Sequence, residues 1–556
     1  MVRALSYCVQ VPCLIRGVMK QVLGVASGLT GEQQADWVRR VVTKWGTWTR
    51  TALALCACVG LSDCAVNPVT GKNDFVVVSQ AQELAMGQQQ YVPSQQMQGG
   101  EYVLDEALSR YMRQVGDRLG AVSDAHLPYE FAVVNNGVPN AWTLPGGKIA
   151  VNRGLLLELN SEAELAAVLG HEITHAAARH TAQQISKGEL AQIGVIAATI
   201  GVGSRPGGDL LVGGAQVGAQ AIMQRYGRDA EREADHYGMV YMKRAGYDPA
   251  AAVVLQQTFV RLSQGQSKDW LSGMFASHPP SEERVQNNEK TLKELGTGGE
   301  INKERYLAAI ARVKKTAPAY SAYDKGRAAF AAGKVEEADR LGHEAVRGEP
   351  REALFHTLLG DVQVRRGDLR QAVSTYDHAV QLNSALFLPH LQRGLAKLKL
   401  NDRAGGEADL QASVKLLPTA VAYNELGKLA NSRGDVENAR RYLSEAAGAG
   451  GSVGDEAQSE LARIDLSSAP GNAIGVQPFL DGNVLSAQVT NGTTIPVQNV
   501  VVEFAMRPVP GAEVVSARRT IATLAPRQTV AVSSGLSAGQ NPEVQVNVVS
   551  ATPAAR

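Results

Sequence analysis

The spacing of apolar residues changes twice along this chain of 556 residues. Between residues 79 and 295 most apolar positions recur at helical spacing, interrupted by a short pair of strand-like segments, and a connecting helix is expected at residues 296–317. From residue 318 to residue 466 small residues recur at a period typical of paired helices, and over residues 473–556 apolar and polar residues alternate as in strands. The pattern predicts a multidomain fold: a mainly α domain with a small sheet, an α-solenoid and a small C-terminal all-β domain.

One helix of the first domain carries a candidate metal-binding motif. Ser161 followed by Glu164 predicts a capping box, and apolar residues keep helical spacing at Ala163, Leu165, Ala166, Leu169 and Ile173. His171 and His175 are four residues apart, so both imidazoles lie on one helix face and can reach one zinc ion. Glu172 is placed to take a proton from water at that metal. A chance match is expected in about one chain per hundred, and two solvated histidines are the other alternative.

A second helix is predicted over residues 219–246, with a proline shortly beyond it. It carries Glu231 and Asp235, which are four residues apart and share a face. A carboxylate from a second helix can supply a third ligand and leave the fourth position to water or substrate, and Asp235 can then accept a hydrogen bond from a liganding histidine. The alternative is a solvated charged face, which we expect for Arg232 and Glu233.

Residues 141–151 predict a strand, a Pro-Gly-Gly turn and a second strand. A strand just before a zinc helix can run along the cleft and bind an extended peptide as a further strand. An ordinary hairpin that only supports the helix is an equally good interpretation.

Two apolar stretches, residues 190–203 and 210–222, separate the two predicted metal helices. Each is about a dozen residues long, short of the ~20 needed to cross a membrane. We expect buried helices with a connection that can act as a lid over the cleft, and no integral membrane segment here.

The next region is repetitive. Two series of positions share spacings of 34, 34 and 33 residues: Gly326, Gly360, Gly394 and Gly427, and then Gly333, Gly367, Asn401 and Gly434. This is the tetratricopeptide period, with small residues where helices touch and a turn residue between them, and it predicts about four repeats. We expect a binding groove for a partner polypeptide; a spacer is the alternative.

After a linker at residues 467–472 the apolar period becomes two. Alternation is clear at Leu485, Ala487 and Val489, and turn residues recur between the alternating stretches. Short strands of this kind predict a small antiparallel sandwich. It contains no acid–base cluster or metal-ligand spacing, so we expect an accessory or binding module.

Composition narrows the chemistry. The formal net charge is +1 with 20% charged residues, which lacks the basic excess that marks nucleic-acid-binding proteins. All five cysteines lie within the first 64 residues, so the later domains contain no disulfide and no thiolate ligand. Zinc must then be held by histidine and carboxylate, which favours a catalytic over a structural site.

The first 64 residues resemble an export signal. A basic stretch, residues 44–50, precedes an eleven-residue apolar segment, residues 51–61, and Cys64 follows. This order resembles a bacterial lipoprotein signal, so we expect lipidation of Cys64 and a polar tether at residues 65–78. Cys58 competes as the modified residue, and a cleaved soluble export signal is the alternative. Some 40 residues precede this signal, which indicates a start assigned too early.

The residues of the second helix resemble a known peptidase group. With the motif of the first helix, the run Arg228-Asp229-Ala230-Glu231-Arg232-Glu233-Ala234-Asp235 is similar to the gluzincins that include the CAAX prenyl protease, HtpX and the mitochondrial Oma proteases. The resemblance implies one zinc ion per chain with Glu231 as the third ligand. It implies that Asp235 supports a ligating histidine.

Two further motifs fit the same group. Asn140, Ala141 and Trp142 match its edge strand, which implies that they bind substrate, and residues 277–284 match a later motif that contains His278 and Arg284. By resemblance, His278 lies close to the metal, where it either stabilises the oxyanion during catalysis or caps the zinc at rest. Arg284 is expected to contact the ligand residues and not the metal itself.

The layout over about residues 67–464 resembles the β-barrel assembly-enhancing proteases of Gram-negative envelopes. It implies a zinc endopeptidase of the periplasm, anchored to the outer membrane by lipid, in which Glu172 takes a proton from water and passes it to the leaving amine. The implied partners are unfolded or misassembled envelope proteins and the outer-membrane assembly machinery, with no nucleic acid. A chaperone-like assembly factor with latent proteolysis and a scaffold whose zinc merely joins two helices are the alternatives.

Overall fold

The computed structural model describes residues 64–192, 226–264 and 278–554. Apart from Cys64, the expected export signal lies outside these residues, as do the first turns of the expected second helix and nearly all of the two apolar stretches before it. No helix within the described residues is both long enough and apolar enough to span a membrane.

The described residues fall into two units, of which the smaller contains residues 64–66 and 73–77. Its described part is a ribbon in which β1 (Cys64–Val66) pairs antiparallel with β2 (Asn73–Phe75). All other described residues belong to the larger unit.

A buried turn opens the larger unit. Asn67 is buried, and its side-chain oxygen accepts hydrogen bonds from the backbone N–H groups of Val69 and Thr70 at 2.9 and 3.2 Å. The backbone N–H of Asn67 also donates to the carbonyl of Lys72 at 2.8 Å, which closes the turn. Residues 65–78 therefore hold strands and a turn where the sequence indicates a polar tether, because one asparagine side chain satisfies the local backbone.

The first domain is built on a three-stranded sheet. Its order is β3 (Glu130–Val134), β5 (Lys148–Asn152) and β4 (Ala141–Leu144), with β3 parallel and β4 antiparallel to β5. The predicted strand pair, β4 and β5, is confirmed. Strand β3 was not predicted from the sequence. Gly146 and Gly147 turn between the pair with φ values of 80° and 84°, which glycine adopts without strain.

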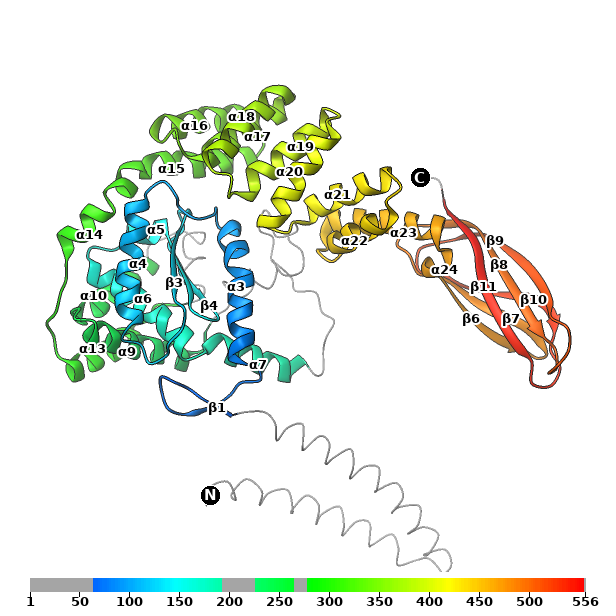
Figure 1. Ribbon diagram of the computed structural model, residues 1–556, viewed down its shortest axis with the longest axis horizontal. Coiled ribbons are helices and arrows are strands. Elements are labelled where there is room, and N and C mark those ends of the chain that lie inside the picture. The colour runs from blue at the N-terminus through cyan, green and yellow to red at the C-terminus, as the bar shows by residue number, and fades with distance from the viewer. Residues whose placement is uncertain (1–63, 193–225, 265–277, 555–556) are drawn as a thin grey trace, which may run out of the picture. The chain divides into compact units, whose positions relative to one another are not determined.

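Helices cover both faces of this sheet (Figure 1). One face packs against α3 around Tyr91 and Trp142, and the other packs against α4 and α6 around Phe131 and Val133. Every residue of α6 is buried, so this helix is the centre of the domain. The described helices are α3 (Gln80–Met97), α4 (Glu106–Gly120), α5 (Arg153–Leu156), α6 (Glu162–Ala177), α7 (His180–Gln192), α9 (Arg228–Arg244), α10 (Ala250–Ser263) and α13 (Glu282–Leu295).

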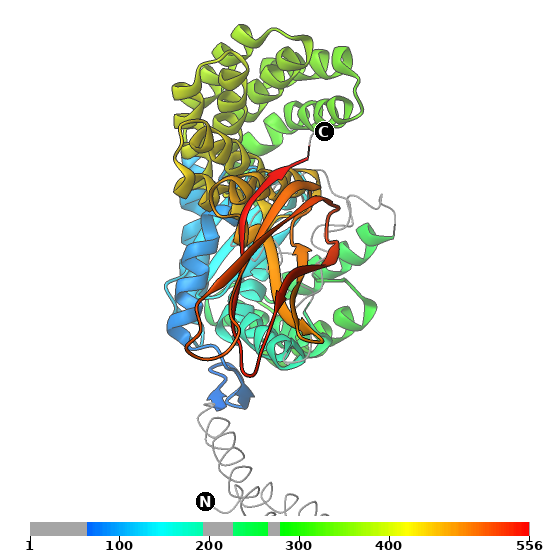
Figure 2. The ribbon, with the colours of Figure 1, turned by 90° about the vertical axis from the view of Figure 1, so that its right-hand side faces the viewer.

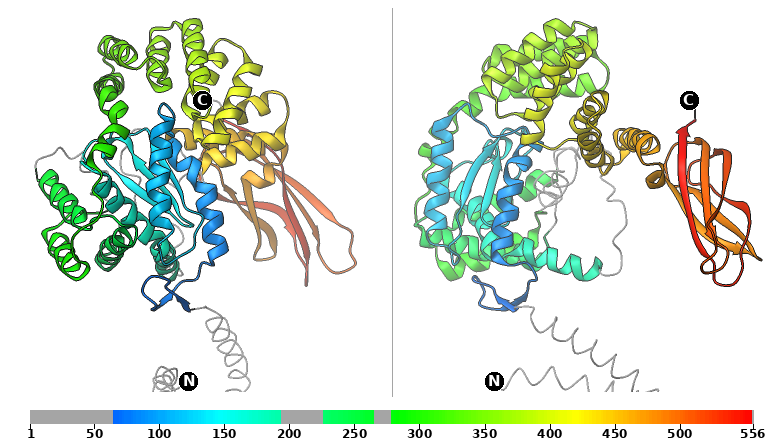
Figure 3. Two further views of the ribbon diagram at one scale, coloured as in Figure 1. Left: turned by 60° about the vertical axis from the view of Figure 1, so that its left-hand side comes forward. Right: turned by 45° about the vertical axis from the view of Figure 1, so that its right-hand side comes forward.

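The repeat region contains four antiparallel helix pairs, as the period predicts (Figure 3). After α14 (Lys303–Ala309), the pairs are α15 (Ala311–Ala331) with α16 (Val335–Gly348), α17 (Ala353–Arg366) with α18 (Leu369–Leu382), α19 (Phe387–Lys399) with α20 (Arg403–Leu416), and α21 (Ala420–Ser432) with α22 (Val436–Ala447). The expected start at residue 318 falls inside α15 rather than between helices.

The repeating residues have the roles that the period suggests. The four residues of the second series all have positive φ between paired helices: Gly333 (76°), Gly367 (92°), Asn401 (66°) and Gly434 (77°). In the first series, a Cβ added at Gly360 would clash with the ring of Tyr376. Small residues therefore let the paired helices approach closely, and the turn residues reverse the chain.

Polar side chains join the first domain to the repeats. The Asn135 amide, just after β3, donates to Glu352 at 2.9 Å, and the Tyr320 hydroxyl donates to the same carboxylate at 2.5 Å. The Arg153 guanidinium donates to Asn135 at 3.2 Å and lies over the Tyr320 ring at 3.5 Å from its centroid. The two parts are therefore bonded through side chains distant in sequence.

The C-terminal module consists of two three-stranded antiparallel sheets (Figure 2), as the alternation predicts. The strand orders are β10-β7-β6 and β11-β8-β9. Before them, α23 (Gly451–Ser468) and α24 (Pro470–Ala473) contain most of the expected linker, because Pro470 begins a helical turn. The strands are β6 (Ile474–Asp481), β7 (Val484–Asn491), β8 (Val497–Arg507), β9 (Val515–Leu524), β10 (Thr529–Ser537) and β11 (Glu543–Pro553).

Candidate active site

The motif histidines lie side by side on α6. The Nε2 atoms of His171 and His175 are 3.0 Å apart, as expected for residues one turn apart. At the start of the helix, the Ser161 hydroxyl accepts from the Glu164 backbone N–H at 3.2 Å. In a full capping box the Glu164 carboxylate would also accept from the backbone N–H of Ser161. Here it accepts from the backbone N–H of Asn160 instead.

Helix α9 crosses α6 closely enough to bring its carboxylates to these histidines. A Cβ added at Gly170 would lie 2.9 Å from the Gly238 carbonyl oxygen, and one at Gly238 would lie 2.9 Å from the His171 nitrogen. The two helix backbones can approach this closely because both positions are glycine and carry no Cβ. Glu231 Oε1 then lies 3.5 Å from His175 Nε2.

Asp235 supports His171 from the far side of the ring. Its Oδ1 lies 3.0 Å from His171 Nδ1, so the ring's Nδ1–H can donate to it while Nε2 faces the other ligand atoms. Arg284 on α13 donates two hydrogen bonds of 2.7 Å to Asp235 and contacts Glu231 Oε2 at 2.9 Å. Burial opposes ionisation of Asp235, but Arg284 and His171 outweigh it and lower the pKa of this carboxyl.

His278 reaches the same point from the segment before α13. Its Nδ1 lies 2.8 Å from Glu231 Oε1 and 3.2 Å from His171 Nε2. Burial works against its charged form, yet Glu231 and Glu172 raise the pKa of the His278 ring. The pKa of Glu231 is held well below its usual range, because His278 and His175 outweigh the cost of burial.

Glu172 is buried beside this cluster. Its carboxylate oxygens have no hydrogen-bond partner within the described part of the chain, and Oε1 lies 3.7 Å from His278 Nε2. Burial raises the pKa of this carboxyl. A carboxyl whose pKa is raised holds a proton more readily, which suits a group that accepts a proton and later returns it.

The donor set fits a metal ion. One ligand atom from each of His171, His175, Glu231 and His278 lies within 4.8 Å of all the others. Neighbouring ligand atoms around a tetrahedral ion with bonds of ~2.0–2.1 Å are ~3.3–3.4 Å apart, and the pairs given above span 2.8 to 3.5 Å. Imidazole and carboxylate donors without sulfur are typical of a catalytic site.

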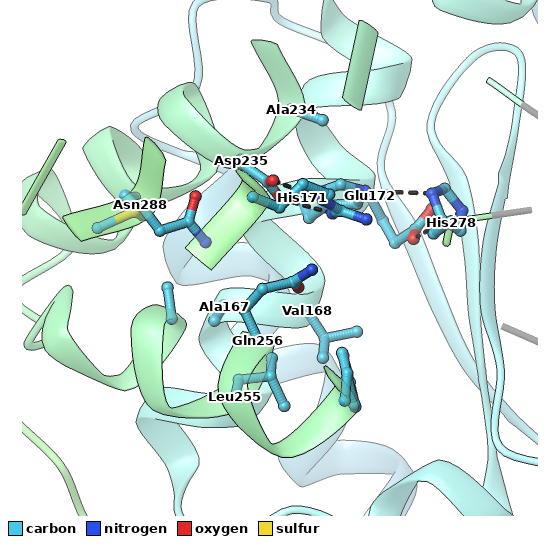
Figure 4. Close-up of a pocket in the computed structure, with 14 residues that line it drawn as sticks. Ala167, Val168, His171, Glu172, Ala234, Asp235, Leu255, Gln256, His278 and Asn288 are labelled. Carbon is cyan, nitrogen blue, oxygen red and sulfur yellow. Dashed lines mark hydrogen bonds and ion pairs between the residues drawn. The ribbon is translucent and has the colours of Figure 1, made fainter. Parts of the chain in front are cut away.

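A small cavity of about 30 Å³ opens beside these candidate ligands (Figure 4). His171 and Glu172 line one side of it, and Val168, Leu255 and Phe259 contribute apolar side chains. Apolar surface next to a base and a metal site can exclude bulk water from the reacting atoms.

The expected substrate-binding residues lie at the edge of the sheet. Asn140 directly precedes β4, and Ala141 and Trp142 begin it. The Trp142 ring packs edge-on against Tyr91 of α3, at 6.1 Å between ring centroids. This side chain serves the core between sheet and helix, so a peptide at this edge would meet the Trp142 backbone instead.

Three residues at the site escaped the sequence interpretation. His180 lies against His175, and Tyr226 stacks on the His175 ring at 3.9 Å between centroids. Glu233, expected on a solvated face, instead lies 3.3 Å from His180 Nε2, and this part of the interpretation is wrong. The local sequence signal for His180 was its position five residues after His175. No local pattern indicated that Glu233 would be its carboxylate partner.

Known proteins share both parts of this architecture. Residues 106–292 match peptidase family M48, and residues 323–385 and 391–453 match the tetratricopeptide repeat. The chain is 26% identical over 379 residues to the beta-barrel assembly-enhancing protease of Yersinia pestis, covering 63% of this chain and 76% of that protein. The protein of that name from Escherichia coli is 24% identical over 375 residues, covering 62% and 75%.

A mitochondrial protease is similar over a shorter part of the chain. The metalloendopeptidase OMA1 of Schizosaccharomyces pombe is 32% identical over 232 residues, covering 41% of this chain and 66% of that protein. These similarities agree with the expected group, and members of family M48 depend on a metal. The chain therefore contains a metalloendopeptidase domain of peptidase family M48, followed by tetratricopeptide repeats.

Proposed function

We propose that this chain is a zinc-dependent endopeptidase of the bacterial cell envelope that cleaves misassembled outer-membrane or periplasmic proteins. The observation that carries the proposal is the convergence of four ligand atoms within 4.8 Å, next to a buried glutamate that has no hydrogen-bond partner among the described residues. The similarity to beta-barrel assembly-enhancing proteases supports the substrate class.

In this proposal His171, His175 and Glu231 hold one zinc ion. Their two imidazoles and one carboxylate are the ligand set of many zinc peptidases, and the donor cluster among the described residues contains no cysteine that would favour a structural site. Asp235 fixes the ring of His171, and Arg284 holds Asp235 and Glu231 in place.

When bound, the zinc ion supplies a Lewis acid that polarises the scissile carbonyl and acidifies water. Glu172 accepts a proton from the attacking water and delivers it to the leaving amine nitrogen as the peptide bond breaks. Its burial and raised pKa suit both halves of this transfer. The apolar walls of the adjoining cavity keep other water away from the carboxylate.

In this proposal His278 controls whether the zinc site is capped or open to substrate. Its Nδ1 lies among the ligand atoms of His171 and Glu231, which supports a resting arrangement in which His278 caps the fourth position. His278→Ala should then raise peptidase activity. If His278 acts only on the oxyanion, the same variant loses activity, so the direction of the change decides between the two roles.

Substrate would reach the site along β4 and be recruited by the repeats. β4 is an edge of its sheet, which supports addition of an extended peptide next to Asn140, Ala141 and Trp142. Repeats of this class stack into binding surfaces for polypeptides, so they suit a misfolded protein or the assembly machinery. Deleting residues 318–466 should change which proteins are cleaved; unchanged substrate choice would reduce the repeats to a spacer.

The proposed location is the periplasm, with lipid on Cys64 anchoring the chain to the outer membrane. Support comes from the signal-like sequence before Cys64 and from the bacterial relatives. Mass spectrometry of the mature N-terminus tests this, because diacylglycerol on Cys64 is expected and an unmodified chain that begins near Met1 would end the lipoprotein proposal.

Glu172→Gln tests the reaction itself. The amide cannot accept the proton, so we expect retained zinc and loss of cleavage of a misfolded β-barrel protein by at least ~100-fold. Glu282→Gln, an exposed glutamate on α13, is the matched control and should cleave normally. Cleavage by Glu172→Gln at the parental rate would refute the enzymatic proposal, and full complementation of a deletion strain by it would favour the chaperone-like alternative.

A further inference from the structure

A chain of hydrogen bonds runs from His175 away from the metal site. His175 Nδ1 lies 2.8 Å from His180 Nδ1, and His180 Nε2 lies 3.3 Å from Glu233 Oε1. The Asn67 amide donates to the same carboxylate oxygen at 3.3 Å. Four side chains from α6, α7, α9 and the turn that opens the larger unit are thus connected in one line.

The direction of each bond follows from the proposed role of His175. Its Nε2 faces the other ligand atoms, so the proton of a neutral ring sits on Nδ1 and donates to His180 Nδ1. His180 then carries its own proton on Nε2 and donates it to the Glu233 carboxylate. Every donor meets an acceptor, and only one tautomer of each ring satisfies the whole chain.

Burial and stacking make this chain a built part of the site. His175, His180 and Asn67 are all at least nine-tenths buried, and the Glu233 side chain is 22% exposed. The Tyr226 ring lies nearly parallel to that of His175, at 19°, and its hydroxyl bonds Thr181 at 2.9 Å. The His175 ring is therefore fixed along its Nδ1 edge and on one face.

We propose that His180 and Glu233 are positioning residues that hold His175 in the tautomer and orientation needed to bind the metal, with Asn67 fixing Glu233. They do for His175 what Asp235 and Arg284 do for His171. This inference rests on the proposed zinc site, because it requires His175 to be a ligand. None of these residues touches substrate; they act through the ligand.

The test measures Zn²⁺ affinity of the full chain by competition with a chromophoric chelator. His180→Ala should weaken Zn²⁺ binding about 10- to 100-fold, the usual effect of removing a group that orients a ligand. Glu233→Ala should weaken it less, because His180 remains. Controls are His126→Ala, an exposed histidine, and Asp229→Ala, a fully exposed carboxylate on the same helix as Glu233; both should bind as the parent does.

A double variant tests whether Glu233 acts through His180. Once His180 is alanine, removing Glu233 should cause no further loss, so the double variant should match His180→Ala. The Co²⁺-substituted protein gives a second readout, because a reoriented ligand changes its visible absorption. Losses that multiply in the double variant, or His180→Ala that binds Zn²⁺ within twofold of the parent, would overturn the proposal.

Loss of folding is separated from loss of positioning by a conservative variant. His180→Asn can place its amide oxygen near the former Nδ1 and accept from His175, so it should recover most of the affinity lost in His180→Ala, with metal-free melting temperatures of the two variants alike. Equal losses in both would overturn the proposal. A parent that binds no Zn²⁺ would refute the proposed function instead, which keeps the two failures distinct.

Discussion

Two clusters in this molecule bury a carboxylate against an arginine, and they shift its pKa in opposite directions. At the candidate metal site the pKa of Asp235 is lowered, because two hydrogen bonds from Arg284 and one from His171 outweigh burial. Between α17 and α18 of the repeats, burial prevails and raises the pKa of Asp361 to about 6, although Arg327 and Tyr376 each donate to it at 2.8 Å.

The difference lies in the number and burial of the positive groups. The Arg284 side chain is 11% exposed and grips Asp235 with two N–H groups, whereas the Arg327 side chain is 40% exposed and offers one. A partner in water is screened, so it compensates less of the cost of burying charge. The candidate metal site thus holds its acid ionised, and the repeat cluster is a packing contact that tolerates a neutral acid.

The largest effect should come from the carboxylate proposed as a metal ligand. Glu231→Gln removes a charged ligand, and we expect Zn²⁺ affinity to fall by more than ~100-fold, beyond the usual loss for groups that only support a ligand. The matched change in the repeats, Asp361→Asn, should leave affinity unchanged. Chelator competition on both variants measures this; parental affinity in Glu231→Gln would remove Glu231 from the ligand set.

The next effect concerns the two arginines. Lysine cannot reproduce a bidentate grip, so Arg284→Lys should weaken Zn²⁺ binding about 10- to 100-fold. Arg327→Lys should not alter it, since Arg327 donates a single bond to a carboxylate remote in sequence from the metal helices. The same titration reports both, and equal affinities would show that Arg284 is as dispensable for the metal as Arg327.

Asp361 should make stability depend on pH. Its pKa in the folded protein is about 6 against an ordinary value of 3.8, so the folded state binds more protons than the unfolded state between these values. Stability from this group is therefore present below pH 4 and is lost as pH rises through 6, by about 2 to 3 kcal/mol.

Asp361→Asn removes this dependence and isolates it from other titrating groups. Between pH 4 and pH 7 the urea midpoint of the parent should fall progressively relative to that of the variant. Urea unfolding of the full chain, monitored by circular dichroism, measures both midpoints. If the parent instead became more stable relative to the variant as pH rises, Arg327 would outweigh burial in setting the pKa of Asp361. The contrast with Asp235 would then disappear.

The smallest effect should come from Tyr376→Phe. The change removes one hydrogen bond to Asp361 and little volume, so we expect a loss of about 1 kcal/mol in unfolding free energy and no change in peptidase activity. Thermal unfolding and a peptide-cleavage assay check both halves. Reduced cleavage with unchanged stability would tie this repeat cluster to the active site.

Several features were predictable because their signal is local. The spacing of His171 and His175 fixes one helix face, the recurrence of Gly333, Gly367 and Asn401 marks turns that the structure shows at positive φ, and alternation in the last region predicts strands. In each case neighbouring residues decide the backbone period, and the period decides which side chains share a face.

The support of the site was not predictable in this way. The sequence places Glu233 on a charged helix face, and only the crossing of α6 and α9 at Gly170 and Gly238 brings it to His180. Likewise, Asn67 lies in a segment with the composition of a tether, yet it is buried against that same carboxylate. Polar residues look alike in sequence whether they meet water or a partner.

The sequence by itself thus determined the helix that carries His171 and His175, the period of the repeats and the strands of the last module. Tertiary structure decided which distant groups hold those histidines and which buried acids keep their charge. The physical reason is that a helix or a strand period depends on residues a few positions apart. Charge and hydrogen bonding in the interior depend on partners that only folding brings within 3 Å or so.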